Sequence, residues 1–361
     1  MNDELTDATA GLLHELLATL DAFSWAQRRL HPPWASRLVE QLGPLREPLG
    51  ASLARVRALE WPEAVRDDGR RLETAAEHAL DALERFAAAP QDPMPAFGLY
   101  RAVRRHVLAL ETLYPLWPAL APINRFFLEE THRADPALLG LLATAAERAP
   151  GEGPPVGVLA EANDRRQRGG FSLFVPEQWH GAQRWPLVVA LHGGSGHGAD
   201  FLWSWVREAR SRGFLVLAPT AADDTWSLFA PQVDGARLEA LVERVAAAWN
   251  VDRGRILLTG MSDGATFSLL YGLRGGTPFT HLAPIAGVLP PLDPRQRAGA
   301  QGKPVYLVHG ALDWMFPVAA ARLAHVELER WGARVTYREL HDLSHTYPRE
   351  ENARILDWLL P

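Results

Sequence analysis

The chain has 361 residues, of which 47% are hydrophobic and 22% are charged, and its formal net charge is −6. This composition is typical of a globular protein long enough for two domains, and the negative charge gives no general attraction to nucleic acid or acidic lipid. The chain contains no cysteine, which excludes disulfides, thiolate metal sites and cysteine nucleophiles.

The N-terminal sequence is acidic and lacks the basic segment and apolar core of a signal peptide. No apolar stretch approaches the roughly 20 residues that a membrane-spanning helix needs. We therefore expect a soluble, cytoplasmic protein without a membrane span.

The first 150 residues show helical periodicity throughout. Apolar residues recur at spacings of three and four from Leu12 to Phe23, and His31-Pro32-Pro33 ends that helix. The same spacing predicts further helices over residues 38–59 (interrupted near Pro44), 62–89, 97–114 and 136–149. No segment alternates like a strand, so residues 1–150 are predicted to form an all-α bundle. The bundle carries no catalytic constellation, and three roles stay open: covering the active site, forming a homo-oligomer, or docking a partner.

A proline- and glycine-rich joint at residues 149–155 predicts a domain boundary at about residue 150. In residues 151–361 short apolar segments alternate with helical patterns. The predicted strands are 171–175, 185–191, 214–217, 255–259, 281–286, 305–308 and 335–340, and the predicted helices are 199–212, 235–250, 265–271, 318–331 and 350–360. This alternation predicts an α/β domain, a mostly parallel sheet with helices on both faces, whose active site lies beyond the C-terminal strand ends.

The strand at 255–259 leads into Gly260-Met261-Ser262-Asp263-Gly264, and a helix follows. Strand, sharp turn and helix around G-x-S-x-G is the arrangement that exposes a nucleophilic serine. The small residues on either side allow strand and helix to approach closely. The alternative is a tight turn without chemistry.

A serine hydroxyl needs a base to remove its proton, and the base needs an acid that orients it. Downstream of Ser262, Asp313 follows the strand 305–308, and His345 precedes the last helix. The order serine, acid, histidine is the one expected when the nucleophile follows such a strand. Asp342 and Asp293 remain alternative acids.

Three other histidines are expected to have non-catalytic roles. We expect His341 to be a surface residue. His192 and His309 each precede a glycine at a strand end, and we expect both to bond nearby loop backbone.

The oxyanion formed during acyl transfer needs two fixed N–H donors. One is predicted to be the backbone N–H of Asp263, and the other that of Gly194 in the turn after the strand 185–191, with Gly193 and Ser195 as alternatives. A plain tight turn is the competing interpretation of this glycine run.

Aromatic residues near the strand ends are candidates for a substrate pocket. They are Trp203, Trp205, Trp226, Phe229 and Trp314, of which Trp226 and Trp314 are chosen because they neighbour strand ends. The sequence shows neither metal-ligand spacing nor a phosphate-binding or dinucleotide fingerprint. We therefore expect no metal and no cofactor.

Five segments together resemble the α/β-hydrolase superfamily, and within it the phospholipase/carboxylesterase and polyhydroxyalkanoate-depolymerase-like esterases. The segments are Leu191-His-Gly-Gly194, Ala218-Pro-Thr220, Gly260–Gly264, His309–Asp313 with Phe316-Pro317, and Ser344-His345. The resemblance implies a Ser262–His345–Asp313 triad, an oxyanion hole at Gly194 and Asp263, and hydrolysis through an acyl-enzyme. The 150-residue helical domain, and the lack of the signal peptide and disulfides found in secreted depolymerases, depart from the family pattern.

The sequence thus predicts a serine esterase that acts on a small-molecule carboxylic ester. A thioesterase, a peptidase or an intracellular polyester depolymerase would use the same triad. The rival from another class is an interaction protein with a hydrolase-like module that no longer turns over.

Overall fold

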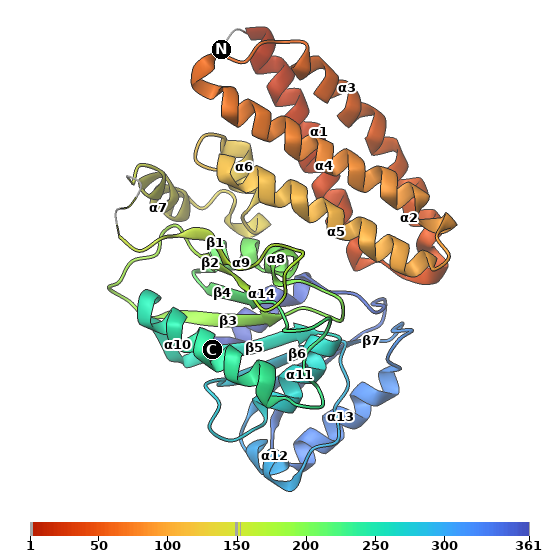
Figure 1. The fold of residues 1–361 in the computed structure, drawn as a ribbon, viewed down its shortest axis with the longest axis vertical. Coiled ribbons are helices and arrows are strands. Elements are labelled where there is room, and N and C mark those ends of the chain that lie inside the picture. The colour runs from red at the N-terminus through yellow and green to blue at the C-terminus, as the bar shows by residue number, and fades with distance from the viewer. Residues whose placement is uncertain (1–2, 149–150, 152, 361) are drawn as a thin grey trace. The chain divides into compact units, whose positions relative to one another are not determined.

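The computed structural model describes residues 3–148, 151 and 153–360. The chain forms two compact units that divide between Leu128 and Glu129, and each has its own elements (Figure 1). Each unit is described by itself below.

The first unit is a set of helices. They are α1 (Asp3–Arg28), α2 (Ala35–Leu42), α3 (Arg46–Arg57), α4 (Arg66–Ala88), α5 (Pro95–Leu113) and α6 (Ala121–Phe126). The predicted stripe of α1 is buried, with Leu12, Leu16, Leu20 and Phe23 all 0% exposed. The interruption predicted near Pro44 is a 3-10 turn between α2 and α3. The long helices lie side by side (Figure 1), and each therefore hides its apolar stripe against its neighbours.

The second unit has eight strands: β1 (Gly157–Glu161), β2 (Phe171–Val175), β3 (Trp185–Leu191), β4 (Leu215–Pro219), β5 (Val251–Met261), β6 (His281–Ile285), β7 (Pro304–Gly310) and β8 (Arg334–Leu340). They form one sheet in the order β1-β2-β4-β3-β5-β6-β7-β8. The pairs β1–β2 and β2–β4 are antiparallel, and the others are parallel. The mostly parallel sheet predicted from the sequence is therefore confirmed.

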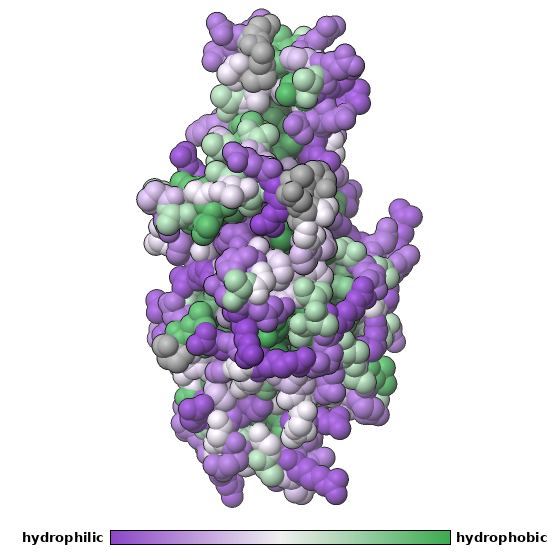
Figure 2. Space-filling model, turned by 90° about the vertical axis from the view of Figure 1, so that its left-hand side faces the viewer, coloured by the Kyte–Doolittle hydropathy of each residue, from purple (hydrophilic) through white to green (hydrophobic). Residues whose placement is uncertain are grey.

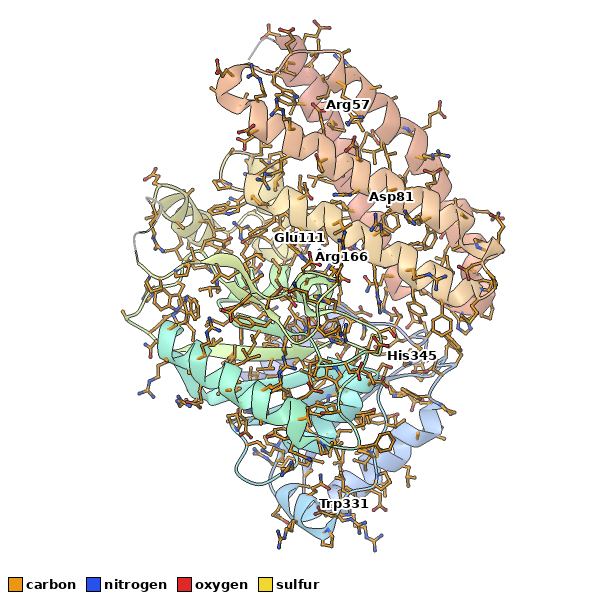
Figure 3. The ribbon with its side chains drawn as sticks, viewed as in Figure 1. Arg57, Asp81, Glu111, Arg166, Trp331 and His345 are labelled. Carbon is orange, nitrogen blue, oxygen red and sulfur yellow. The ribbon has the colours of Figure 1, made fainter. Side chains whose placement is uncertain are left out.

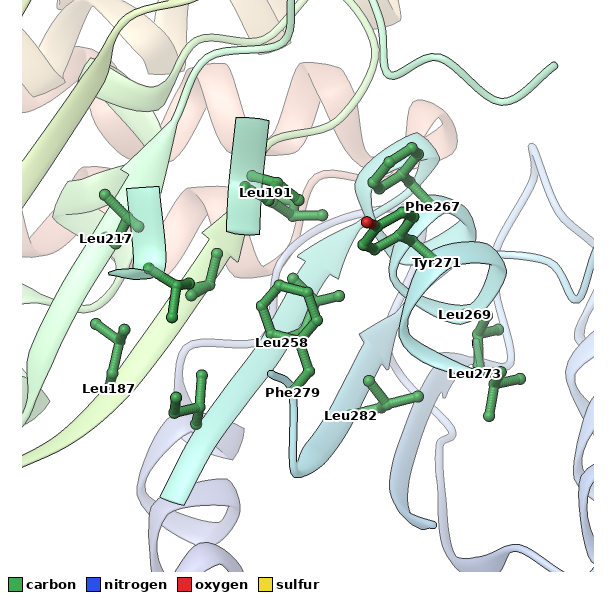
Figure 4. Packing of buried hydrophobic residues seen from close by; sticks show 14 of the residues in the cluster. Leu187, Leu191, Leu217, Leu258, Phe267, Leu269, Tyr271, Leu273, Phe279 and Leu282 are labelled. Atoms are coloured by element: carbon green, nitrogen blue, oxygen red, sulfur yellow. The ribbon is translucent and has the colours of Figure 1, made fainter. Parts of the chain in front are cut away.

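The helices of this unit are α7 (Pro136–Ala146), α8 (Gly198–Phe201), α9 (Val206–Arg212), α10 (Gln232–Trp249), α11 (Asp263–Gly272), α12 (Pro294–Gly299), α13 (Val318–Arg330) and α14 (Glu350–Leu359). Every residue of β3 is buried, as expected for a central strand covered on both faces. Figure 4 shows how α11 covers the sheet: Phe267 and Tyr271 stack with 5.8 Å between ring centroids, beside leucines of β5 and β6 such as Leu258 and Leu282. The core thus lies directly beneath the strand ends that the candidate site uses.

Several elements differ from the sequence prediction. The helix expected over 199–212 is divided into α8, a 3-10 turn at Leu202–Ser204 and α9. β1, α6 and α12 were not predicted. The compact units divide at Leu128, whereas the change in periodicity lies near residue 150. Glu129 is the first residue of the second unit and is bonded within it: its N–H donates to Ser211 Oγ (2.8 Å), and its carboxylate pairs with Arg212 (2.7 Å).

The surface of the chain is mixed in polarity. On the face drawn in Figure 2, hydrophilic and hydrophobic residues are interspersed. Within the described ranges, no helix combines the length and apolarity needed to cross a bilayer.

Candidate active site

Ser262 lies at the turn between β5 and α11 and has a strained backbone, with φ 56° and ψ −119°. Its N–H donates to the carbonyl of Ile285 on the neighbouring strand (3.0 Å). A Cβ on Gly260 would lie 2.5 Å from the backbone of Gly264, and one on Gly264 would lie 2.5 Å from the carbonyl oxygens of Leu191 and His192. Both glycines are therefore required for the close approach of strand and helix that holds this turn.

The structure brings Ser262, His345 and Asp313 together from three separate segments. His345 lies in the loop between β8 and α14 (Figure 3), and its Nε2 is 3.1 Å from Ser262 Oγ. Its Nδ1 is 2.9 Å from Asp313 Oδ2. Because the carboxylate accepts, Nδ1 carries the hydrogen and Nε2 can accept the serine proton. All three residues are at least nine-tenths buried.

Asp313 is fixed by its own turn after β7. Its Oδ1 accepts the backbone N–H groups of Met315 (2.9 Å) and Phe316 (2.8 Å), which leaves Oδ2 for His345. The Phe316 ring meets the His345 ring edge-on, with centroids 5.2 Å apart. The residues that follow Asp313 thus orient both the acid and the histidine.

The alternative acids have other places in the structure. Asp293 caps α12 through a capping box with Gln296. Asp342 is exposed, as is His341. The carboxylate that bonds His345 Nδ1 is that of Asp313, so Asp313 is the acid that the geometry favours.

His192 and His309 both bond loop backbone, as the sequence suggested. His192 Nε2 accepts the Ala221 N–H (3.1 Å), and His309 Nε2 donates to the Phe316 carbonyl (2.9 Å). His309 has a second contact that the sequence did not indicate: its Nε2 lies 3.4 Å from Asp313 Oδ2. The spacing of four between the two residues was visible, but only the turn after β7 brings the side chains together.

The candidate oxyanion donors lie beside Ser262. A Cβ placed on Gly193 would lie 3.4 Å from the Ser262 Cβ, so this turn lies next to Ser262. The Ser195 N–H already donates to the Asp224 carbonyl (2.8 Å), which removes Ser195 as a donor. Asp263 opens α11, so its N–H has no partner within the helix. Gly194 therefore stays the predicted second donor, with Gly193 as the alternative.

The aromatic candidates divide by exposure. Trp226 is only 2% exposed, its Nε1 donates to the His192 carbonyl (2.8 Å), and its ring lies against those of His192 and Phe267. Its indole is enclosed next to the turn, and its place in a pocket wall stays a prediction. Trp314 is 40% exposed next to Asp313. Trp203 and Trp205 are buried, and Phe229 is fully exposed.

No group of three or more His, Asp or Glu side chains in the described ranges is arranged to hold a metal ion. The imidazole of His345 bonds Ser262 Oγ, and the turn that contains Gly193 lies next to Ser262. A base and hydrogen-bond donors around a serine hydroxyl are what acyl transfer requires.

Residues 235–360 match the sequence model of the phospholipase/carboxylesterase family. The matched segment begins in α10 and contains Ser262, Asp313 and His345. The order and direction of the strands in the second unit are those of the α/β-hydrolase fold. The predicted resemblance to phospholipase/carboxylesterases is thus confirmed over residues 235–360, whereas the turn with Gly194 and the helical unit lie outside the match.

Solved structures with a similar fold include a thermostable esterase, at 22% identity and a TM-score of 0.45 over 56% of this chain and 62% of that one. Esterase PE8 is 21% identical, with a TM-score of 0.44 over 57% of this chain and all of that one. Acyl-protein thioesterase 2 of Zea mays is 17% identical, with a TM-score of 0.41 over 53% and 98%. The chain spans less than two thirds of the thermostable esterase. No curated protein matches the sequence.

Proposed function

We propose that the chain is a serine hydrolase that cleaves carboxylic esters through an acyl-enzyme, with Ser262 as nucleophile, His345 as base and Asp313 as orienting acid. The observation that carries the proposal is the hydrogen-bonded series Ser262 Oγ, His345 Nε2, His345 Nδ1 and Asp313 Oδ2, at 3.1 and 2.9 Å. Nucleophile, base and acid are in the order and at the distances that general-base catalysis needs.

In the first half of the reaction Ser262 Oγ attacks the ester carbonyl carbon while its proton passes to His345 Nε2. The carbonyl electrons move onto oxygen, and the N–H groups of Asp263 and Gly194 hold that charge. Collapse breaks the bond to the leaving alkoxide, which takes the proton from Nε2. Water then repeats these steps on the acyl-enzyme and releases the acid. Asp313 stabilises the imidazolium in both halves.

The test uses a fluorophosphonate, which reacts with an activated serine whatever the natural substrate is. We expect one covalent adduct by intact mass on the wild type, none on Ser262→Ala, and an unchanged adduct on Ser36→Ala, which alters an exposed serine of α2. Asp313→Asn should lower the labelling rate by on the order of 10⁴-fold, because the imidazole loses its orienting acid.

An adduct that persists on Ser262→Ala contradicts the proposal. A folded wild type that forms no adduct and hydrolyses no ester supports the non-catalytic interaction protein instead. Thioesters, peptides and polyesters would use the same series of residues, so hydrolysis rates on matched esters, thioesters and amides decide among these classes.

A further inference from the structure

The side chain of Asp263 borders the predicted oxyanion site. Asp263 directly follows Ser262, and its Oδ2 accepts a hydrogen bond from Thr225 Oγ1 (2.6 Å). A Cβ built on Gly194 would lie 2.7 Å from the same oxygen. One residue therefore supplies a predicted oxyanion donor through its N–H and a carboxylate beside the other predicted donor.

The turn that carries Gly194 is held by other contacts as well. The Ser195 N–H bonds the Asp224 carbonyl (2.8 Å), and Arg168 Nη1 donates to the Gly196 carbonyl (2.7 Å). Trp226 Nε1 bonds the His192 carbonyl (2.8 Å). These three bonds hold the turn without involving the Asp263 side chain.

The charge of Asp263 has no cationic partner among the residues that the structure describes. Asp263 is half-buried, and its side chain accepts a hydrogen bond from the neutral hydroxyl of Thr225. Arg168, the guanidinium bonded to this turn, donates to the backbone carbonyls of Asp223 and Gly196. A carboxylate next to the developing oxyanion repels it, and the repulsion is strong in a site sheltered from water.

We infer that Asp263 determines substrate specificity by selecting esters with a cationic group close to the scissile carbonyl and by rejecting anionic ones. The inference rests on the proposed function. A substrate ammonium beside Asp263 neutralises the carboxylate and attracts the oxyanion, so it stabilises the transition state more than the ground state. A substrate carboxylate adds a second like charge at the same place.

The experiment measures kcat/KM of the full-length protein on three p-nitrophenyl esters of similar length: 4-(trimethylammonio)butanoate, pentanoate and hemisuccinate. The wild type should prefer the cationic over the anionic ester by at least about 100-fold. Asp263→Asn, which keeps the size and an acceptor for Thr225, should reduce that ratio at least about tenfold. The neutral ester reports any change common to all substrates.

Asp223→Asn is the matched control, since it removes an exposed carboxylate on the loop next to the same turn. Its ratio should equal that of the wild type. Asp263→Ser provides a second variant if Asp263→Asn does not fold, and it should give the same loss of preference.

A cation-to-anion ratio that is the same in the wild type and in a folded Asp263 variant overturns the inference while leaving the proposed function intact. An equal loss of the cation-to-anion preference in Asp223→Asn also overturns the inference. The preference would then come from the combined negative charge of the loop. Failure of the proposed function looks different: no ester is hydrolysed and no fluorophosphonate adduct forms.

Discussion

The backbone conformation of Ser262 depends on how closely the neighbouring segments of backbone approach it. The serine has φ 56°, a conformation that is costly for a residue with a side chain and persists only where the surroundings enforce it. Gly260 and Gly264 enforce it by allowing β5, α11 and the end of β3 to meet at distances no Cβ would permit. The backbone conformation of Ser262 thus depends on two residues that have no side chain.

His309 contacts Asp313, the proposed acid. It is 0% exposed, it donates to Phe316, and its Nε2 lies 3.4 Å from Asp313 Oδ2, while no described residue bonds its Nδ1. The contact is to the oxygen that His345 also bonds. We infer that His309 is a positioning residue for the acid.

We predict that His309→Leu lowers the fluorophosphonate labelling rate by up to about 100-fold, because a misplacement of Asp313 by even about 1 Å transmits to His345. His309→Gln retains an N–H donor toward Phe316 and should recover most of the rate. Thermal denaturation of both variants gives the control. If His309→Leu lowers the melting temperature but not the labelling rate of the folded protein, His309 supports only the loop.

At the scale of elements, the loop between β8 and α14 determines where His345 lies. Tyr347 in this loop is 2% exposed, and its hydroxyl donates to Asn352 Oδ1 (2.7 Å). Asn352 Nδ2 in turn donates to the Ser204 carbonyl (2.6 Å). The loop is thereby tied to both α14 and the 3-10 turn before α9.

Burial, followed by the nearby Glu208, raises the pKa of Tyr347 well above its usual value. The hydroxyl therefore stays a donor well into the alkaline range.

We predict that Tyr347→Phe costs about 1–3 kcal/mol of unfolding free energy, since it leaves a buried amide oxygen without its donor. We also expect a slower fluorophosphonate reaction, because the loop that carries His345 loses a tether. Tyr271→Phe is the control: its hydroxyl donates to Glu239 (2.7 Å) on α10, away from this loop's contacts. Equal labelling rates in the two variants would show that the Tyr347 tether does not act on His345.

At the scale of the whole molecule, the chain consists of two compact units, and the second contains every candidate site residue. The division at Leu128 assigns α7 and Glu129 to the second unit. Glu129 is bonded there to Ser211 and Arg212, and Arg212 also bonds Asp357 on α14 (2.5 Å). The second unit therefore begins before the proline-rich segment.

We predict that a fragment of residues 129–361 is more stable than one of residues 151–361 by about 1–3 kcal/mol, because only the longer fragment keeps the charge-assisted bond to Arg212. Urea denaturation measures the difference, and full-length Glu129→Gln isolates the contribution of the charge. Equal stability of the two fragments would favour a boundary at residue 150. Fluorophosphonate labelling of residues 129–361 also tests whether the helical unit closes the site.

Much of the fold could be predicted from local patterns. β2 and β3 have the predicted bounds, and the helices α1, α4 and α5 follow their apolar stripes. The elements that the sequence did not predict correctly depend on contacts with distant segments of the chain. β1 is a half-exposed edge strand whose five residues carry no strong alternation, and it exists because it pairs with β2. The helix over 199–212 is broken at Leu202–Ser204, where Ser204 accepts from Asn352, far along the chain.

The sequence by itself determined the α/β class of the second unit, the elbow at Ser262, and the candidates Asp313 and His345, because strand periodicity, glycine spacing and chain order are local properties. Only the tertiary structure decided which acid meets His345, that Trp226 is enclosed, that Ser195 has already used its N–H, and that His309 and the carboxylate of Asp263 adjoin the site. Those facts depend on distances between segments that are far apart in the chain. Tertiary packing determines these distances, and local sequence patterns carry no information about them.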